Sequence, residues 1–291
     1  MTGLHDADRG QRLSRRLPGP LRRLARRYSD WNYAWQVDIA LRYVPVEAAL
    51  SADGWLTGKA RVLDVGCGSK GGVTSYVPVR TVGVDLSFNE ARIRRHPAVT
   101  PVVGSALRLP VADAAVDVAL CMDTLEHLSP SQREQLIDEL FRVTRPGGVV
   151  IAGAPCGLKA RAAEQVASAR YQGRTGREHP WLAEHLMYPP MTPDGLRSMM
   201  GDAAGRRFVR YEVRLVANTN LQLWQLLQEQ GALRHVHRAL FRPWWPWLRE
   251  QHAPPVYRQV CIVRDTTKPW SGTDSPGRVV EPRTTHERLS T

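Results

Sequence analysis

Short β-rich runs alternate with helical segments through the centre of this 291-residue chain, and that order constrains its fold more than any other feature. The runs end in glycines or carboxylates, and most are followed by helical spacing. Such alternation is typical of a parallel sheet covered by helices. Five predicted strands lie in this stretch: 61–65, 80–85, 100–103, 116–121 and 147–153.

The helix between the fourth and fifth runs has well-marked ends. Ser129 and Gln132 match a capping box, Pro130 takes the first helical position, and Pro-Gly-Gly at 146–148 ends the helix. One face of this helix is apolar, and we expect it to pack on the sheet. The residues of that face are Leu136, Ile137, Leu140 and Phe141.

Two later β-rich runs, 207–216 and 256–263, bring the predicted strands to seven. Insertions at 156–190 and 218–254 precede them. The first insertion is polar and rich in arginine, and the second carries an aromatic cluster broken by prolines. Residues 266–291 have almost no apolar content, so we predict a disordered tail there.

Charge and cysteine content exclude several classes of protein. The net charge is +12, but residues 60–157 carry ten basic and ten acidic side chains, so the excess lies in the flanks. The four cysteines lack the spacing of zinc ligands or of a disulfide framework. We therefore expect no metal site and a reducing, cytoplasmic setting. The sequence contains no run of 18 apolar residues, so no membrane-spanning helix is predicted, and no signal peptide is expected.

A glycine turn and the expected start of a helix follow the first run. Gly66, Gly68 and Gly71 have the spacing of dinucleotide-binding loops, and Asp85 ends the next run, where a carboxylate can accept both hydroxyls of a ribose. A dinucleotide-dependent oxidoreductase is therefore one alternative. Asp64, however, lies two residues before the first glycine. A carboxylate there favours a cationic ligand and opposes a pyrophosphate.

Further motifs follow the acidic-x-Gly-x-Gly segment in order. They are Val84-Asp85-Leu86-Ser87, the segment Gly104 to Pro110, residues 117–127 with Leu-Glu-His, and residues 142–148. This set, covering about residues 60–153, resembles the class I S-adenosylmethionine-dependent methyltransferases, and most closely their type 11 small-molecule branch. The resemblance implies an α/β, Rossmann-like, seven-stranded, mostly parallel sheet with helices on both faces and the last strand inserted antiparallel.

The resemblance also implies S-adenosylmethionine as the cofactor. The methionine end would be held by Asp64, Gly66, Cys67 and Gly68, and closed off by Cys121 and Met122. The ribose and adenine would contact Asp85, Leu86, Ser105 and Ala106. Ser105 stands where the family commonly has an acid, so the expected hydrogen bond to the adenine amino group is weakened or lost.

Methyl transfer to oxygen requires alignment of the acceptor, exclusion of water and a group that takes the proton. His127 follows the fourth strand, and His185 lies in the first insertion. Imidazole suits the task, because its ordinary pKa is about 6.5. We predict that one of these two histidines is the base. His127 is equally suited to fixing the loop that carries it.

The flanks suggest the acceptor. Residues 21–28 form a basic amphipathic helix by spacing, and tryptophans cluster at 241–247. Both features favour anionic lipid surfaces. We therefore predict a small-molecule or lipid-linked acceptor and peripheral contact with an anionic membrane. A purely structural role, as cap and lid, is the alternative. Nucleic acid is disfavoured as a partner, because the sequence lacks an Asn/Asp-Pro-Pro-Tyr/Phe segment.

These features predict three parts. Residues 1–58 form a basic N-terminal helical cap, residues 59–265 a methyltransferase domain with the two insertions, and residues 266–291 the tail. The expected activity is methylation of a small or lipid-like acceptor, most simply at oxygen. A non-catalytic protein on the same fold is a further alternative.

Overall fold

The computed structural model describes residues 18, 20–21, 36–228, 241–267 and 284–287. Its strands form one sheet in the order β3-β2-β1-β4-β5-β7-β6-β8. The strands are β1 Val62–Val65, β2 Thr81–Asp85, β3 Val99–Val103, β4 Val116–Met122, β5 Thr144–Pro155, β6 Arg210–Asn220, β7 Val256–Asp265 and β8 Thr284–Glu287. The first five in sequence are parallel, and β7 lies antiparallel between β5 and β6. The predicted seven-stranded, mostly parallel Rossmann-like sheet is confirmed.

Strand β8 is an addition to that prediction. It pairs antiparallel with β6, with Thr284 opposite Val213 and Glu287 opposite Arg210. These four residues lie within the segment predicted to be a disordered tail. Without β8, β6 would be an edge strand with unpaired backbone groups, to which an added strand can pair. The other residues after 267 lie outside the described part of the chain.

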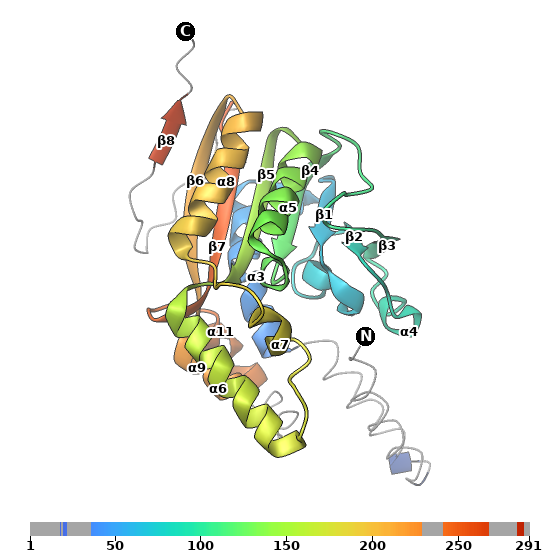
Figure 1. Cartoon of the computed structure of the whole chain (residues 1–291). Helices are drawn as coiled ribbons and strands as arrows, with labels where there is room; N and C mark the ends of the chain where they lie inside the picture. Colours follow the sequence, from blue (N-terminus) through green and yellow to red (C-terminus); the bar gives the residue numbers. More distant parts are fainter. Residues whose placement is uncertain (1–17, 19, 22–35, 229–240, 268–283, 288–291) are drawn as a thin grey trace.

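Helices cover both faces of the sheet (Figure 1). Helix α3 (Val37–Ala52) packs on one face, and α5 (Pro130–Val143) and α8 (Pro193–Arg207) pack on the other. The capping box at the start of α5 forms as predicted, and the four apolar residues predicted to face the sheet are fully buried. The sheet core therefore follows directly from the apolar periodicity of the sequence.

The segment after β1 differs from the expected helix start. Instead of an α-helix, it forms two single turns of 3-10 helix, η2 (Gly68–Lys70) and η3 (Gly72–Ser75). Gly71 separates them with a φ of 82°, in the left-handed region that favours glycine. A pyrophosphate would need the aligned N–H groups of a longer helix, which this loop does not provide.

The two insertions form a helical layer beside the carboxyl ends of the parallel strands (Figure 1). The first holds α6 (Gly157–Thr175) and α7 (Leu182–His185); the second holds α9 (Leu221–Gln228), η6 (Arg242–Trp244) and α11 (Trp245–Leu248). Trp224 of α9 stacks on Tyr257 of β7 with ring centroids 4.0 Å apart. The first insertion, predicted to be polar, is mostly helical.

Of the predicted N-terminal cap, the structure describes chiefly residues 36–58, which include α3 and η1 (Trp55–Thr57). The amphipathic segment 21–28 lies outside the described residues apart from Leu21. Among the helices that are described, none is long and apolar enough to cross a membrane.

Candidate active site

Asp64 lies at the centre of the sheet, near the end of β1, and its side chain is buried. Its Oδ2 accepts a hydrogen bond of 2.8 Å from the backbone N–H of Val73. Burial raises the pKa of Asp64 to about 7, against the lowering effects of that N–H and of Arg42. A cationic ligand beside this carboxyl group would favour its ionised form.

Two glycines let the loop approach Asp64 and the segment after β4. At Gly66, whose φ is 76°, a Cβ atom would lie 2.0 Å from Oγ1 of Thr124. At Gly72, a Cβ atom would lie 2.1 Å from Oδ2 of Asp64. Side chains at either position would displace the carboxyl group or the loop after β4, so close approach requires glycine here.

Asp85 ends β2 and faces the same loop. Its Oδ2 accepts a hydrogen bond of 2.9 Å from the backbone N–H of Gly68. The carboxylate is only partly buried, and the neighbouring Leu86 is 75% exposed. A carboxylate and an exposed apolar side chain therefore stand side by side at the edge of the loop, an arrangement that suits a ribose and an adenine.

The remaining predicted cofactor residues occupy different surroundings. Cys121 and Met122 are buried in the cores on opposite faces of the sheet, and burial raises the pKa of the Cys121 thiol. Cys67 is buried against Gly83 of β2. Ser105 and Ala106 are partly buried beyond β3, where Oγ of Ser105 accepts a hydrogen bond from the N–H of Leu107. The side chains of Cys67, Cys121 and Met122 thus pack in the interior of the protein.

The two predicted catalytic histidines meet. His127 belongs to η4 (Leu125–His127) and His185 to α7, and their Nε2 atoms lie 3.3 Å apart. Nδ1 of His127 lies 2.8 Å from Oε2 of Glu184, and Nδ1 of His185 lies 2.8 Å from Oε1 of Glu164. The same Glu164 oxygen accepts a hydrogen bond of 2.8 Å from the Tyr257 hydroxyl. Both rings are therefore oriented by carboxylates.

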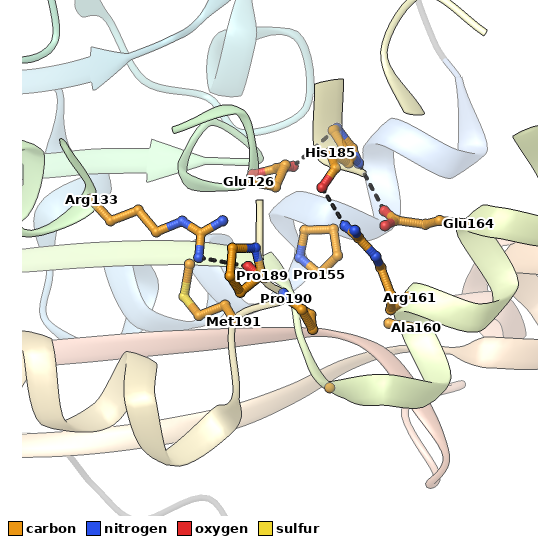
Figure 2. A pocket seen from close by; sticks show the side chains of 11 residues that line it. Glu126, Arg133, Pro155, Ala160, Arg161, Glu164, His185, Pro189, Pro190 and Met191 are labelled. Atoms are coloured by element: carbon orange, nitrogen blue, oxygen red, sulfur yellow. Dashed lines mark hydrogen bonds and ion pairs between the residues drawn. The ribbon is translucent and has the colours of Figure 1, made fainter. Parts of the chain in front are cut away.

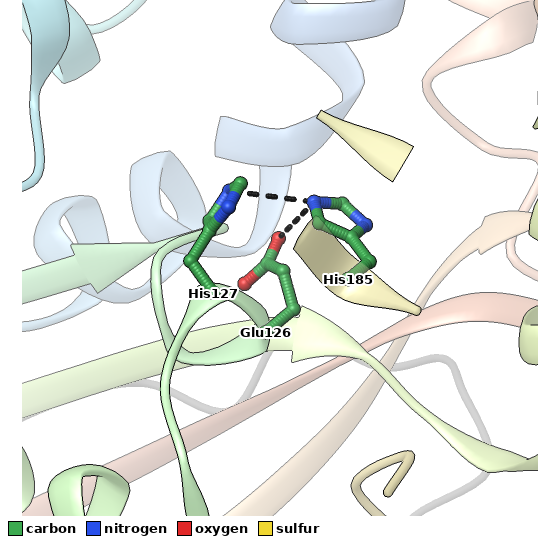
Figure 3. A group of neighbouring side chains, drawn as sticks. All are labelled: Glu126, His127 and His185. Carbon is green, nitrogen blue, oxygen red and sulfur yellow. Dashed lines mark hydrogen bonds and ion pairs between the residues drawn. The ribbon is translucent and has the colours of Figure 1, made fainter. Parts of the chain in front are cut away.

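Glu126 lies beneath this pair (Figure 3). Its side chain is 7% exposed, and Oε1 is 3.9 Å from Nε2 of His185. Burial and the charge of Asp123 raise the pKa of Glu126 to about 8. Burial alone would lower the pKa of His185, but Glu164 and Glu126 raise it overall. For His127, burial and the charge of His185 lower the pKa.

A small pocket, partly open to solvent, adjoins the cluster (Figure 2). It is lined by Glu126, Glu164, His185, Arg133 and Arg161 together with prolines, small residues of α6 and Met191. Both arginines are held by backbone carbonyls: Arg133 by those of Leu125 and Pro189, and Arg161 by those of His185 and Leu186. The pocket therefore combines carboxylates, an imidazole and guanidinium groups.

Asp123 lies between β4 and Thr124, whose side chain lies against Gly66 of the glycine loop. It follows β4 with a φ of 53°, a strained value for a residue other than glycine. Arg258 of β7 holds both of its carboxylate oxygens, and Arg42 of α3 lies 2.9 Å from Oδ2. Burial would raise the pKa of Asp123, but the two arginines hold it below its usual range. Arginines from β7 and α3 therefore hold the strained turn at Asp123 in place.

Sequence reasoning missed several residues of the pocket. Glu126 directly precedes His127 in the Leu-Glu-His motif, so the choice of His127 as a candidate also points to Glu126. Glu164, Tyr257 and Arg42 carry no such signal, because each comes from a separate element and meets its partner, His185, Glu164 or Asp123, only after folding.

The loop geometry fits S-adenosylmethionine better than a dinucleotide. A buried carboxyl group suits a cationic ligand, two glycines permit close contact, and the Asp85 carboxylate lies against the backbone of the loop. The lack of an α-helix after Gly66 removes the usual pyrophosphate site.

Comparisons with known proteins agree with this geometry. Residues 63–152 match the family described as "Methyltransferase domain". The chain is 36% identical over 98 residues to a probable S-adenosylmethionine-dependent methyltransferase of Mycolicibacterium smegmatis, covering 32% of this chain and 37% of that protein. The chain spans less than two thirds of the length of the first curated relatives it matches.

Two further comparisons cover more of the chain. An uncharacterized methyltransferase of Mycobacterium bovis (strain BCG / Pasteur 1173P2) is 30% identical over 223 residues, covering 67% of this chain and 85% of that protein. A crystal structure of a SAM-dependent methyltransferase from Archaeoglobus fulgidus aligns with a TM-score of 0.45 and 15% identity, covering 75% of this chain and 92% of that one. On the sequence matches, the chain belongs to the class I S-adenosylmethionine-dependent methyltransferases.

Proposed function

We propose that the protein transfers a methyl group from S-adenosylmethionine to a hydroxyl oxygen of a small or lipid-like acceptor. The observation that carries this proposal is the continuity of two sites. The side chain of Thr124 contacts the glycine loop, and two residues later the chain reaches Glu126, His127 and the pocket. A donor in the loop and an acceptor in the pocket would therefore meet at the end of β4.

When bound, S-adenosylmethionine supplies an electrophilic methyl group. The residues of this chain align the acceptor and take its proton. Because the Nδ1 atoms of His127 and His185 face carboxylates, their Nε2 atoms are the sites left for that proton. His127 is the more exposed of the two, with 28% of its side chain accessible against 10% for His185. We assign the contact with the acceptor hydroxyl to His127.

The surface of the helical layer supports an amphiphilic acceptor. Trp244 and Trp247 are 65% and 60% exposed, and Leu158, Trp181 and Met187 are also exposed. Exposed tryptophans beside Arg242 suit the boundary between water and an anionic lipid surface. Binding to anionic vesicles at low salt, and its loss in the double variant Trp244→Ala/Trp247→Ala, would support this part. A lack of binding by the wild type would remove it.

Calorimetry separates the candidate functions. We expect heat on addition of S-adenosylmethionine or its demethylated product and none with a nicotinamide dinucleotide. Transfer of a labelled methyl group to phenols, quinols or lipid extracts then identifies the acceptor class. Binding of the nicotinamide compound alone would overturn the proposal in favour of an oxidoreductase. Cofactor binding without transfer to any acceptor would favour a non-catalytic role.

A further inference from the structure

Three groups with unshared electron pairs converge at the cluster of Glu126, His127 and His185. Both carboxylate oxygens of Glu126 are buried and have no hydrogen-bond partner among the described residues. A buried carboxylate without a partner is strongly unfavourable. Figure 3 shows the Glu126 side chain directed toward the two imidazoles.

The two imidazoles also bring lone pairs close together. A neutral imidazole carries its hydrogen on one nitrogen only. Carboxylate oxygens of Glu184 and Glu164 lie 2.8 Å from the two Nδ1 atoms, so the hydrogens belong there. The Nε2 atoms then present lone pairs to each other at 3.3 Å. Two lone pairs at this distance repel unless a proton or a metal ion lies between them.

The spacing fits a metal ion. Ligand atoms from the three residues all lie within 4.8 Å of one another. Two imidazole nitrogens bound at about 2.0–2.1 Å to a tetrahedral ion lie about 3.4 Å apart. The observed separation of the Nε2 atoms is 3.3 Å, and Oε1 of Glu126 is 3.9 Å from Nε2 of His185. A small movement of the Glu126 side chain completes the set.

The surroundings of the histidines are also those of a metal site. Metal-binding histidines usually donate their other ring N–H to a carboxylate, which fixes the orientation of the ring. Glu184 does this for His127 and Glu164 for His185, and Glu164 is itself fixed by Tyr257. Such orientation is present here although the two histidines come from distant segments.

We propose that Glu126, His127 and His185 bind one divalent ion of the zinc class, for which Zn²⁺ and Co²⁺ are probes. Two imidazoles and one carboxylate favour such borderline ions over Mg²⁺ or Ca²⁺. Three protein ligands leave one position open, as in catalytic zinc sites. The exposed side of His127 gives access to it. The sequence alone predicts no metal site, because it lacks the spacing of zinc ligands.

The inference deepens the proposed function, and rests on it only for the role of the ion. The ion and a proton are alternative occupants of the same lone pairs. A hydroxyl group bound at the open position would be acidified by the ion, so that the imidazoles would act as ligands in the metal-loaded protein. The binding of metal itself requires neither cofactor nor acceptor.

Metal uptake by the full chain tests the inference. After treatment with a chelator and its removal, the protein is dialysed against Zn²⁺ and analysed for metal, and titrated in parallel with Co²⁺ while visible absorption is recorded. We expect one ion per chain and an absorption band of tetrahedral Co²⁺. Glu126→Gln and His185→Ala should each weaken binding at least 100-fold. Glu178→Gln, which alters an exposed acid of the same insertion, is the matched control and should bind as the wild type.

Glu164→Gln provides a second test that keeps all three ligands. Loss of a group that orients a ligand typically weakens metal binding 10- to 100-fold. No uptake by the wild type, or equal uptake by Glu126→Gln, His185→Ala and the control, would overturn the inference. Calorimetry with S-adenosylmethionine is run on the same samples. Metal binding without cofactor binding would sink the proposed function alone, and cofactor binding without metal binding would sink the inference alone.

Discussion

The two ends of the site are built in different ways. The cofactor end uses one short stretch, in which Asp64, the glycine loop and Asp85 are positioned by backbone contacts. The acceptor end joins η4, α6, α7 and β7 through side chains such as those of His127 and Glu164. Backbone geometry leaves a motif in the sequence, whereas side chains that converge from separate elements leave none.

The two ends also differ in how their carboxyl groups are paired with cationic groups. At the cofactor end a single buried carboxyl group, Asp64, has its pKa raised to about 7 by burial, which outweighs the lowering effects of the Val73 N–H and of Arg42. At the acceptor end, carboxylates are matched to histidines and arginines, as Glu164 is to His185 and Asp123 to Arg258. One end is prepared for a charged ligand, and the other for a proton or an ion.

The largest expected effect separates the two ends. His127→Ala and His185→Ala should each lower turnover 10²- to 10⁴-fold, the usual contribution of a positioned proton acceptor. The dissociation constant for S-adenosylmethionine, measured by calorimetry, should stay unchanged, because neither ring contacts the glycine loop. Near-normal turnover in both variants would remove both histidines from catalysis.

The reverse effect is expected at Asp64. Asp64→Asn should weaken S-adenosylmethionine binding about 100-fold, since a charge-assisted contact is lost at a buried position. The melting temperature of the free protein should not fall, because the variant no longer buries a carboxyl group. Turnover at saturating cofactor should remain close to that of the wild type.

Asp194→Asn, at an exposed acid in the first turn of α8, is the control for the change of charge and should bind cofactor normally. Equal cofactor affinity in Asp64→Asn and wild type would mean that the two ends do not differ as described. It would also withdraw the placement of the methionine end beside Asp64.

Most of the fold could be predicted from the sequence, and so could the meeting of Asp64, the glycine loop and Asp85. Periodicity located β1 to β7 but not β8, and the capping box located the start of α5. The boundary of β6 was less well predicted. It begins at Arg210 and not at Arg207, because α8 continues through Arg207. Apolar alternation cannot distinguish the last turn of a helix from the first residues of a strand.

The acceptor end shows where such reasoning stops. His127 and His185 were found as separate candidates, but their contact was not, since they are distant in sequence and α7 has no motif. The expected helix after Gly66 was also wrong. Left-handed glycines at 68, 71 and 72 interrupt the hydrogen bonding that an α-helix needs. Both cases depend on backbone or side-chain geometry that residue type alone does not determine.

A smaller effect is expected from pH. The ionised form of Asp64 is the one that attracts a cationic ligand, and its pKa in the free protein is about 7. Raising the pH from 6 to 8 converts mostly protonated into mostly ionised carboxyl, so affinity for S-adenosylmethionine should increase about tenfold and then level off. Calorimetry across this range measures it. Asp64→Asn should lack the change, and a wild-type affinity that falls over the same range would contradict the assignment.

The smallest effect should come from Tyr257 at the acceptor end. Tyr257→Phe removes the hydrogen bond to Glu164 but keeps the ring that stacks on Trp224. Loss of one such bond, about 0.5–1.5 kcal/mol, corresponds to a two- to tenfold change. Turnover should therefore fall by that factor, through a less fixed His185, while cofactor affinity stays constant. Tyr188→Phe is the control: Tyr188 lies in the first insertion, as Glu164 does, but outside this chain of hydrogen bonds. This variant should turn over normally. If Tyr257→Phe instead altered cofactor affinity and left turnover unchanged, the two ends would be coupled through β7, and their separation would fail.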